Sequence, residues 1–182
     1  MQKKQKIIAI RHGQTDWNAA GRIQGRTDIP LNDTGRQQVQ AATLALPNGI
    51  DCILASPLQR ALETAQIINA RYQIPLLTDN RLTERDFGDF EGMSMHELDL
   101  PAMRRWTDNL PTPNGETIRD VATRVFACLD SIKKTYAGKT ILLVAHAHVV
   151  RTIIWYFNGI PDPKNEIVPE IDTSGFFCFP WN

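Results

Sequence analysis

The sequence predicts a protein of the α/β class, because apolar strand patterns and amphipathic helix patterns alternate along the chain. Residues 7–10, 51–55 and 140–145 are short apolar runs that contain β-branched side chains, which is typical of buried strands. A segment with apolar side chains at helical spacing follows each run, after a loop in the first case. Ligands of open α/β sheets bind beyond the carboxyl ends of the strands, so we expect the functional residues there.

The length and charge of the chain limit its organisation and its partners. A chain of 182 residues allows one well-buried core and is marginal for two, so we expect a single domain over residues 1–182. The 20 basic and 20 acidic residues balance, so no overall charge would attract nucleic acid or an anionic membrane. No apolar run approaches the roughly 18 residues of a membrane span, and the basic N-terminus lacks a signal-peptide core. We expect a cytoplasmic protein that acts on a small molecule, with a homodimer left open.

The three cysteines give no sign of a metal site. Cys52, Cys128 and Cys178 are far apart and form neither a Cys-x-x-Cys motif nor a zinc-ligand spacing. Each lies in an apolar stretch, so we expect buried thiols in a reducing compartment.

The first predicted strand ends in Arg11-His12-Gly13, which places a guanidinium and an imidazole at the expected ligand edge. Gly13 permits a close backbone approach or a positive φ. Arg11 can bind an oxyanion through two parallel hydrogen bonds, and Asn18 adds a neutral donor. This set suits a tetrahedral anion with a nitrogen nucleophile beside it. The tripeptide alone fits equally well a strand-end arginine and a histidine that caps a turn.

A second anion site is predicted after the strand at residues 51–55. Residues 56–59 (Ser-Pro-Leu-Gln) indicate a helix N-terminus, with Ser56 as its cap and the proline at the first helical position. A helix that starts after a strand favours an anion, because its free N–H groups and dipole point there. Arg60 lies near this start, off the apolar face, although an exposed helical arginine is by itself the commoner case.

Two loops carry further candidates. Residues 19–31 have no periodic apolar face and form a loop long enough to be functional. Residues 82–92 are rich in aromatic residues and glycine, and they contain Glu84 and Glu91, two candidates for proton transfer. A carboxylate partly enclosed beside Phe87 would serve as an acid, because desolvation raises its pKa.

The remaining segments are read as scaffold. Residues 93–113 fit a helix with a break at Pro101, whose apolar side chains form core or a lid and where substrate choice is set. Asn32 is expected to cap the first helix, and residues 115–117 begin a long amphipathic one. Residues 176–179 predict a last strand.

Five motifs together resemble the histidine phosphatase superfamily, the phosphoglycerate-mutase-like family. They are Arg11-His12-Gly13-x-Thr15-x-Trp17-Asn18, Arg22-x-Gln24-Gly25-x-x-Asp28-x-Pro30-Leu31, Ser56-Pro57-Leu58-x-Arg60-Ala61-x-Glu63-Thr64-Ala65, Leu82-x-Glu84-x-x-Phe87-Gly88-x-Phe90-Glu91-Gly92 and Leu143-Val144-Ala145-His146-x-x-Val149-Val150-Arg151. They occur in the family's order across residues 7–151. The resemblance implies a three-layer α/β/α sandwich around a mostly parallel sheet.

The resemblance also implies a reaction and its residues. His12 is the nucleophile that forms a phosphohistidine, Glu84 is the general acid and base, and Glu91 is structural. The expected catalytic residues are His12, Glu84, His146, Arg11 and Arg60, and the expected phosphate-binding residues are Arg11, Asn18, Gln24, Gly25, Arg60, His146 and Ala147. No metal and no cofactor are expected, because the arginines take the part that Mg²⁺ plays elsewhere.

Within the family the resemblance favours a phosphatase that hydrolyses a small-molecule phosphate ester. A mutase must hold the released product and return the phosphoryl group to it, and the chain lacks the long insertions of the family's glycolytic mutases. An α-ribazole-phosphate phosphatase, a sugar-phosphate phosphatase and a broad-specificity enzyme stay open. So do a cofactor-dependent mutase-type transfer and a non-catalytic phospholigand-binding module.

The chain departs from the family after His146, where the family commonly has two glycines and this chain has Ala147 and His148. Successive positions of a regular helix differ by about 100°, so the two imidazoles would point roughly 200° apart. We therefore expect one of them, His146, to face the phosphate.

Overall fold

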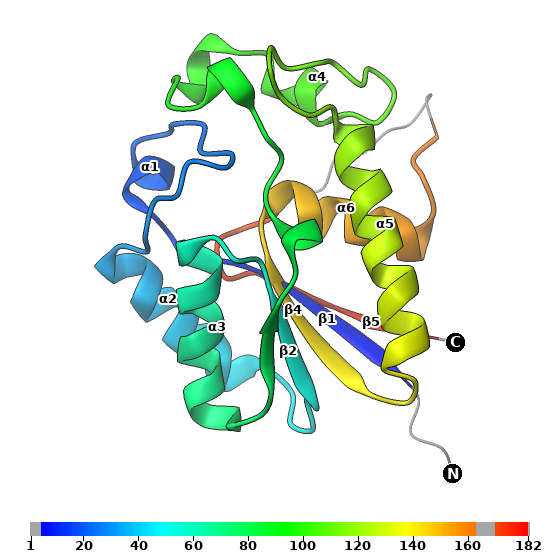
Figure 1. Cartoon of the computed structure of the whole chain (residues 1–182). Coiled ribbons are helices and arrows are strands. Elements are labelled where there is room, and N and C mark those ends of the chain that lie inside the picture. The colour runs from blue at the N-terminus through cyan, green and yellow to red at the C-terminus, as the bar shows by residue number, and fades with distance from the viewer. Residues whose placement is uncertain (1–4, 163–169, 182) are drawn as a thin grey trace.

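The sheet at the centre of the molecule has five strands in residues 5–162 and 170–181, which the computed structural model describes (Figure 1). The strands are β1 (Lys6–Arg11), β2 (Cys52–Ala55), β3 (Leu76–Thr78), β4 (Thr140–Ala145) and β5 (Phe176–Pro180). Their order is β3-β2-β4-β1-β5, and neighbours run parallel except β5, which is antiparallel to β1. The mostly parallel sheet is therefore confirmed.

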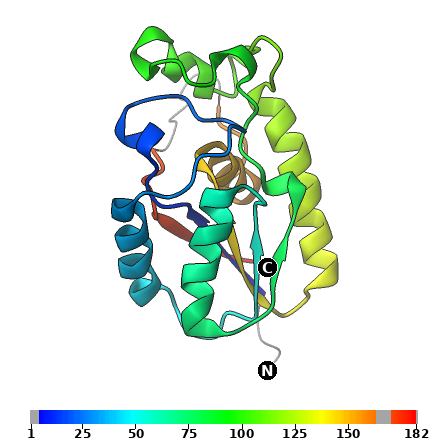
Figure 2. The same ribbon diagram turned by 60° about the vertical axis from the view of Figure 1, so that its left-hand side comes forward.

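Helices cover both faces of the sheet (Figure 1, Figure 2). One face carries α2 and α3, and the other carries α5 and α6. The helical segments are α1 (Asp16–Ala19), α2 (Asp33–Ala45), α3 (Gln59–Tyr72), η1 (Asn80–Leu82), η2 (Gly88–Phe90), η3 (Met95–Glu97), α4 (Leu100–Arg104), α5 (Ile118–Thr135) and α6 (Ala147–Asn158). Among the described residues, no helix has the length and apolar character needed to cross a membrane. The three-layer α/β/α sandwich is confirmed.

Strand β1 shows why the sheet takes a helical layer on each face. Successive side chains of a strand point to opposite faces. Ile7 and Ala9 belong to the core beneath α5 and α6, whereas Ile8 and Ile10 belong to the core beneath α2 and α3. All four are buried, so this continuous apolar run can only be a strand covered on both sides.

Two predicted helix starts are confirmed by their caps. The Asn32 side chain accepts a hydrogen bond of 2.8 Å from the Gly35 backbone N–H at the start of α2. Thr117 caps α5, where its hydroxyl accepts from the Asp120 N–H and the Asp120 carboxylate accepts from the Thr117 N–H. Both caps satisfy N–H groups that the helix itself leaves without partners.

The start of α3 differs from the prediction that Ser56 caps it. The helix begins at Gln59, and its N-cap residue Leu58 makes no side-chain cap. Asp28, from the preceding loop, accepts a 2.8 Å hydrogen bond from the Gln59 N–H instead. The Ser56 hydroxyl accepts a hydrogen bond of 3.3 Å from the Leu58 N–H, one residue before the helix, and also lies 2.8 Å from Nε2 of His146, a contact across the site.

The break predicted at Pro101 within residues 93–113 is wrong. The segment forms two short pieces, η3 and α4, and Pro101 lies in the first turn of α4. A proline is tolerated there because the N–H that it lacks has no partner within the helix. Both pieces lie above the carboxyl edge of the sheet (Figure 1), where Met103 packs in a small cluster with Ile23 and Phe87.

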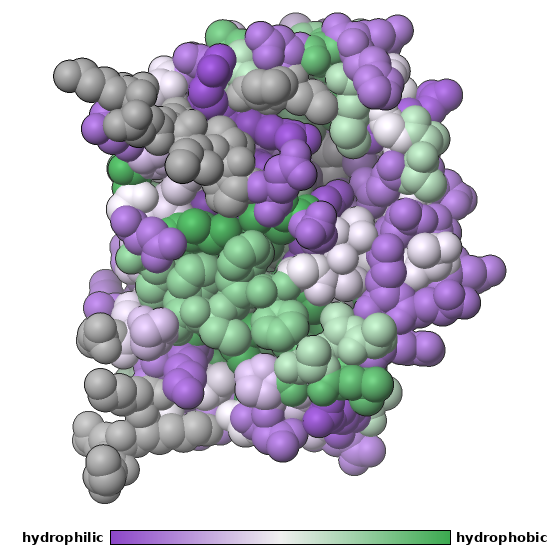
Figure 3. Space-filling view, turned by 180° about the vertical axis from the view of Figure 1, so that it is seen from behind, coloured by the Kyte–Doolittle hydropathy of each residue, from purple (hydrophilic) through white to green (hydrophobic). Residues whose placement is uncertain are grey.

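The prediction of three buried cysteines holds for two of them. Cys52 and Cys128 are buried, but Cys178 is exposed. It lies on the edge strand β5, where Phe177 and Phe179 turn toward the core of α5 and α6, so alternation turns Cys178 to the other face. An apolar area covers much of the molecule on the side seen from behind in Figure 3.

Candidate active site

A cavity of about 370 Å³ lies at the carboxyl ends of β1 and β4, where Arg11 ends β1 and Ala147 begins α6. The predicted site residues that line it are Arg11, His12, Asn18, Gln24, Gly25, Arg60, Glu84 and Ala147. His146 is fully buried and lies outside the lining. Parallel strands end at one edge of a sheet, which is why residues distant in sequence meet here.

His12 has one protonated and one unprotonated ring nitrogen. Its Nδ1 lies 2.7 Å from the carbonyl oxygen of Gly13, and a carbonyl only accepts, so Nδ1 carries the proton. Its Nε2 accepts a hydrogen bond of 3.3 Å from Nε of Arg60. Burial, and then the charge of Arg60, hold the pKa of His12 well below its usual value. The ring is therefore neutral at neutral pH, as a nitrogen nucleophile must be.

Two glycines hold His12 against the helical layer. A Cβ atom on Gly13 would lie 2.5 Å from the carbonyl oxygen of Gly35 in α2, which is shorter than the van der Waals contact that a Cβ atom makes with an oxygen. The Gly13 N–H donates to the Thr64 hydroxyl at 3.2 Å, which links the strand end to α3. Of the two roles considered for Gly13, close backbone approach is the one observed.

Arg60 is fully buried instead of exposed on its helix. Nη1 donates to the Thr27 carbonyl at 3.0 Å and Nη2 donates to the Gly25 carbonyl at 2.6 Å. Burial lowers its pKa to about 10, and the acidic groups around it, Glu84 first, oppose that shift. Arg60 therefore stays charged at neutral pH and places a fixed cation beside Nε2 of His12.

Two more residues of the cavity lining carry buried N–H groups. Arg11 donates from Nη1 to the Ile171 carbonyl at 2.6 Å, while its Nε has no hydrogen-bond partner among the described residues. Gln24 is buried and accepts from the Thr15 hydroxyl, and in the same part of the chain its Nε2 lacks a partner. Buried N–H groups are seldom left unbonded, so both are placed to bind an anion.

His146 lies next to His12 but turns to another partner. The two ring centroids are 5.1 Å apart, with the planes inclined by 61°. Nε2 of His146 is 2.8 Å from the Ser56 hydroxyl. Burial, and then Arg60, hold the pKa of His146 well below its usual value, so the ring is neutral. Its binding of phosphate stays a prediction.

Glu84 is the carboxylate of the cavity wall. It is 7% exposed, and its Oε1 accepts from the Arg85 N–H at 2.9 Å. Burial raises its pKa, but His148, His146 and the Arg85 N–H outweigh burial and hold the pKa well below the usual value. Desolvation therefore opposes the net shift instead of deciding it, and the use of Glu84 as an acid stays a prediction.

Glu91, the competing carboxylate, is occupied by the protein itself. It accepts hydrogen bonds from the backbone N–H groups of Arg26, Thr27 and Phe87 at 2.7 to 3.2 Å, and from the Thr27 hydroxyl. It does not line the cavity. These contacts fix the loop that carries Gln24, which is a structural task.

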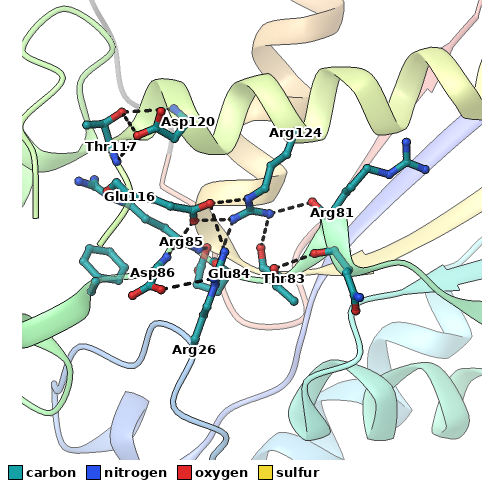
Figure 4. A network of polar contacts seen from close by, with 12 residues as sticks. Arg26, Arg81, Thr83, Glu84, Arg85, Asp86, Glu116, Thr117, Asp120 and Arg124 are labelled. Atoms are coloured by element: carbon teal, nitrogen blue, oxygen red, sulfur yellow. Dashed lines mark hydrogen bonds and ion pairs between the residues drawn. The ribbon is translucent and has the colours of Figure 1, made fainter. Parts of the chain in front are cut away.

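A network of charged groups holds the Glu84 loop (Figure 4). Arg124 of α5 donates to the carbonyl groups of Thr83 and Glu84 at 2.7 and 3.0 Å. It also binds Glu116 through Nε and Nη2, both at 2.9 Å, and Glu116 is 3.2 Å from Arg26. Arg124 could not be identified from the sequence, because an arginine on an amphipathic helix gives no sign of the carbonyl groups to which it donates.

His148 lines the cavity beside Glu84, whereas His146 lies beside His12 and outside the lining, so the two imidazoles have different partners, and which of them faces the phosphate stays a prediction. His146 is the N-cap of α6 with extended backbone angles, φ −132° and ψ 171°, so the angle of a regular helix does not apply to it. His148 in the first turn of α6 turns toward Glu84. The capping geometry of this helix start was not visible in the sequence.

The model of the histidine phosphatase superfamily (branch 1) matches residues 7–169. The chain belongs to the histidine phosphatase superfamily. It is 36% identical over 159 residues to the uncharacterized phosphatase PhoE of Bacillus subtilis, covering 87% of this chain and 79% of that protein. It is 37% identical over 158 residues to phosphoglycerate mutase-like protein 4 of Arabidopsis thaliana, covering 81% and 69%.

The solved structures agree with this membership. YhfR of Bacillus stearothermophilus superposes with a TM-score of 0.84 at 30% identity, over 96% of this chain and 90% of that one. The motif-based assignment to the family is confirmed, and so is the fold that it implied.

This histidine phosphatase pocket contains further charged residues that were not among the predicted site residues. Arg22, Arg104 and Arg151 line it as cations, and Glu170 and Asp172 line it as anions. Arg104 belongs to the segment expected to set substrate choice. Among the described residues, no group of three or more histidine, cysteine, aspartate or glutamate side chains could hold a metal ion.

Proposed function

We propose that this histidine phosphatase is a metal-independent phosphomonoesterase that acts on a small phosphorylated metabolite through a phosphohistidine at His12. The observation that carries the proposal is the pair of contacts made by His12: Nδ1 lies 2.7 Å from the Gly13 carbonyl oxygen, which leaves Nε2 as the unprotonated nitrogen, and Nε2 lies 3.3 Å from Nε of Arg60. A neutral imidazole beside a fixed cation is a nucleophile placed next to an anion site.

In the proposed first step, Nε2 of His12 attacks phosphorus and the bond from phosphorus to the ester oxygen breaks. The leaving oxygen takes a proton from Glu84. In the second step, water attacks the phosphorus of the phosphohistidine and gives its proton to Glu84. The bond from phosphorus to Nε2 breaks, which releases inorganic phosphate and restores His12. Arg11 and Arg60 offset the charge on the non-bridging oxygens, in the way that Mg²⁺ does in other phosphoryl-transfer enzymes.

The other expected phosphate ligands support the same cradle. The Gln24 side chain offers an N–H group, and Ala147 opens α6, whose N-terminus favours an anion. Asn18 lines the cavity and is held by Thr15, with its Oδ1 accepting from the Thr15 N–H at 3.2 Å. We assign these residues to phosphate binding.

Glu84 must be protonated when the ester bond breaks, although its pKa in the free enzyme is low. A bound phosphate dianion adds negative charge near the carboxylate, and like charge raises the pKa of an acid. Substrate binding therefore loads the proton that the leaving group needs. This order of events also keeps Glu84 ready as a base after the alcohol departs.

Phosphoryl transfer of the mutase type and ligand binding without catalysis are the alternatives. The relatives include both a phosphatase and a phosphoglycerate mutase-like protein by name. We favour hydrolysis because the segment above the cavity, η3 and α4, is short, and a mutase needs a closed pocket. Initial rates on α-ribazole phosphate, on sugar phosphates and on a broad range of other esters would decide among these three kinds of substrate.

Turnover of p-nitrophenyl phosphate in excess EDTA tests the proposal. We expect release of p-nitrophenol and of inorganic phosphate at the same rate with and without EDTA. Loss of activity in EDTA would indicate a metal-dependent hydrolase, and absence of turnover in both conditions would indicate a binding module. Transfer of the phosphoryl group to an added alcohol in place of water would favour the mutase.

The arginines beyond the phosphate cradle predict which esters are preferred. Burial, and then Arg104, lower the pKa of Arg151 to about 10, and Arg104 also lowers the pKa of Arg11. Glu170 and Asp172 oppose these shifts, but among the described residues five arginines line the cavity against three carboxylates, so its lining has a net positive charge that a bound anion stabilises. We therefore expect esters with a second anionic group, such as a carboxylate, to be better substrates than neutral esters of equal size.

Arg104→Ala checks this preference in a panel of matched esters. We expect KM to rise by roughly tenfold for the carboxylate-bearing ester, the worth of one exposed charge-assisted contact, and to change little for the neutral one. Arg105→Ala is the matched control, because Arg105 is paired with Asp108 and does not line the cavity. Equal changes for both esters in Arg104→Ala would contradict the assignment.

A further inference from the structure

His148 stands where the family commonly has glycine, and its side chain is buried against the proposed acid. Nδ1 lies 3.7 Å from Oε2 of Glu84, and both side chains are 9% exposed. The backbone N–H of His148 points at the same oxygen from 3.5 Å. The Phe87 ring packs edge-on against the imidazole, with the centroids 5.1 Å apart. The carboxylate of Glu84 and the imidazole of His148 are thus packed close together, with the Phe87 ring against the imidazole.

The imidazole faces the cavity without another partner. Neither Nδ1 nor Nε2 has a hydrogen bond to any of the described residues. Buried polar atoms are normally satisfied, so a ring with two open nitrogens beside a carboxylate is placed to exchange a proton. A shift of under 1 Å would bring Nδ1 within hydrogen-bond distance of Oε2.

We propose that Glu84 and His148 act as one proton-holding pair, in which His148 positions and shares the proton that the leaving group receives. This inference rests on the proposed function, since it concerns the acid of the same reaction. The pair gives one proton to the ester oxygen as the bond to phosphorus breaks. It regains that proton from the water that attacks the phosphohistidine, so the pair is unchanged after one turnover.

Two interacting groups that hold one proton titrate as a unit. The pair keeps its proton to higher pH than the carboxylate alone, because the proton has two sites. In the free enzyme, burial lowers the pKa of His148 to about 4 and Glu84 opposes that shift. The other charged or titratable groups that face the pair are Arg11, Arg60, Arg85, His146 and Arg151.

The first test measures titration and needs no turnover. The chain has four histidines, so the imidazole signals of the isotope-labelled protein are few, and the one lost in His148→Gly identifies His148. Glu84→Gln removes the negative charge that favours the imidazolium, so the pKa of His148 should fall by about one unit or more. An unmoved titration would overturn the coupling, whatever the enzyme hydrolyses.

The second test measures leaving-group dependence in His148→Gly. We expect kcat/KM for an alkyl phosphate to fall by about tenfold more than for p-nitrophenyl phosphate, whose leaving group needs little protonation. Activity toward the alkyl ester should decline at a lower pH than in the wild type, and added imidazole should restore part of it. His96→Ala, at an exposed histidine of η3, is the control.

The outcomes separate this inference from the proposed function. An equal loss for both esters with an unshifted pH profile would reduce His148 to a packing residue, while turnover by the wild type would still support the phosphatase. Absence of wild-type turnover would remove the proposed function. The titration result would then still decide whether the pair exists.

Discussion

His12→Ala is expected to reduce turnover of phosphate esters by roughly a millionfold, to the background rate, because it removes the nucleophile. The labelled phosphoenzyme should disappear with it. In the wild type that adduct should be labile to acid and stable to alkali, since phosphorus is bound to nitrogen. Rapid acid or alkali quenching after mixing with labelled ester, followed by scintillation counting of the protein, measures both properties.

His146→Ala is the informative comparison for this experiment. His146 lies 5.1 Å from His12 by ring centroids but outside the cavity lining. Its removal should slow formation of the adduct for every ester while leaving the adduct chemically the same, because His12 still carries the phosphoryl group. An acid-stable adduct in the wild type would indicate a phosphoserine ester and would contradict the assignment of His12 as the nucleophile.

The sequence predicted the parts of this molecule in which local pattern and tertiary demand agree. The continuous apolar run of residues 7–10 predicts a strand that is buried on both faces, and β1 is such a strand. Asn32 caps its helix through Oδ1, while its contacts with the more distant Gln14 and Asp16 use the other atom, Nδ2, and so do not compete with the cap. The motifs then located the cavity, since His12, Arg60 and Glu84 follow strands or helix starts that meet at one edge.

The failures come from contacts between segments far apart in the chain. Ser56 has the sequence of a helix cap, but its hydroxyl lies against His146, ninety residues later. Arg85 looks like a surface residue, yet it is fully buried and donates to the carbonyl groups of Glu116 and Leu110. No periodicity reports such a contact, because the carbonyl groups that satisfy a buried arginine belong to loops.

The contact of His148 with Glu84 could not be predicted, for a different reason. A helical wheel treats every residue as part of the helix, whereas His146 is the capping residue with an extended backbone. A shift of one residue in the start of α6 changes which imidazole reaches the cavity. Element boundaries are the least certain part of a sequence-based prediction, and here one boundary carries the chemistry.

Glu84→Gln should lower kcat/KM for alkyl phosphates by roughly a hundredfold to ten-thousandfold, the range in which a general acid contributes. Glutamine keeps the size of the side chain and can accept from the Arg85 N–H as glutamate does, so the fold should persist. The loss should be smaller for p-nitrophenyl phosphate, because its leaving group departs without a proton. Steady-state kinetics on both esters, with a thermal melt of each protein, supply the measurement.

Glu91→Gln is the control that the chain itself provides. It changes the same chemical group four residues from Phe87, but Glu91 is held by N–H groups of the protein and does not line the cavity. We expect it to cost about 1–3 kcal/mol of stability, since an amide oxygen satisfies those donors less well than a carboxylate. The melting temperature should fall by a few degrees, with the preference between the two esters unchanged. If Glu91→Gln instead showed the leaving-group-dependent loss and Glu84→Gln did not, the proton donor would be Glu91.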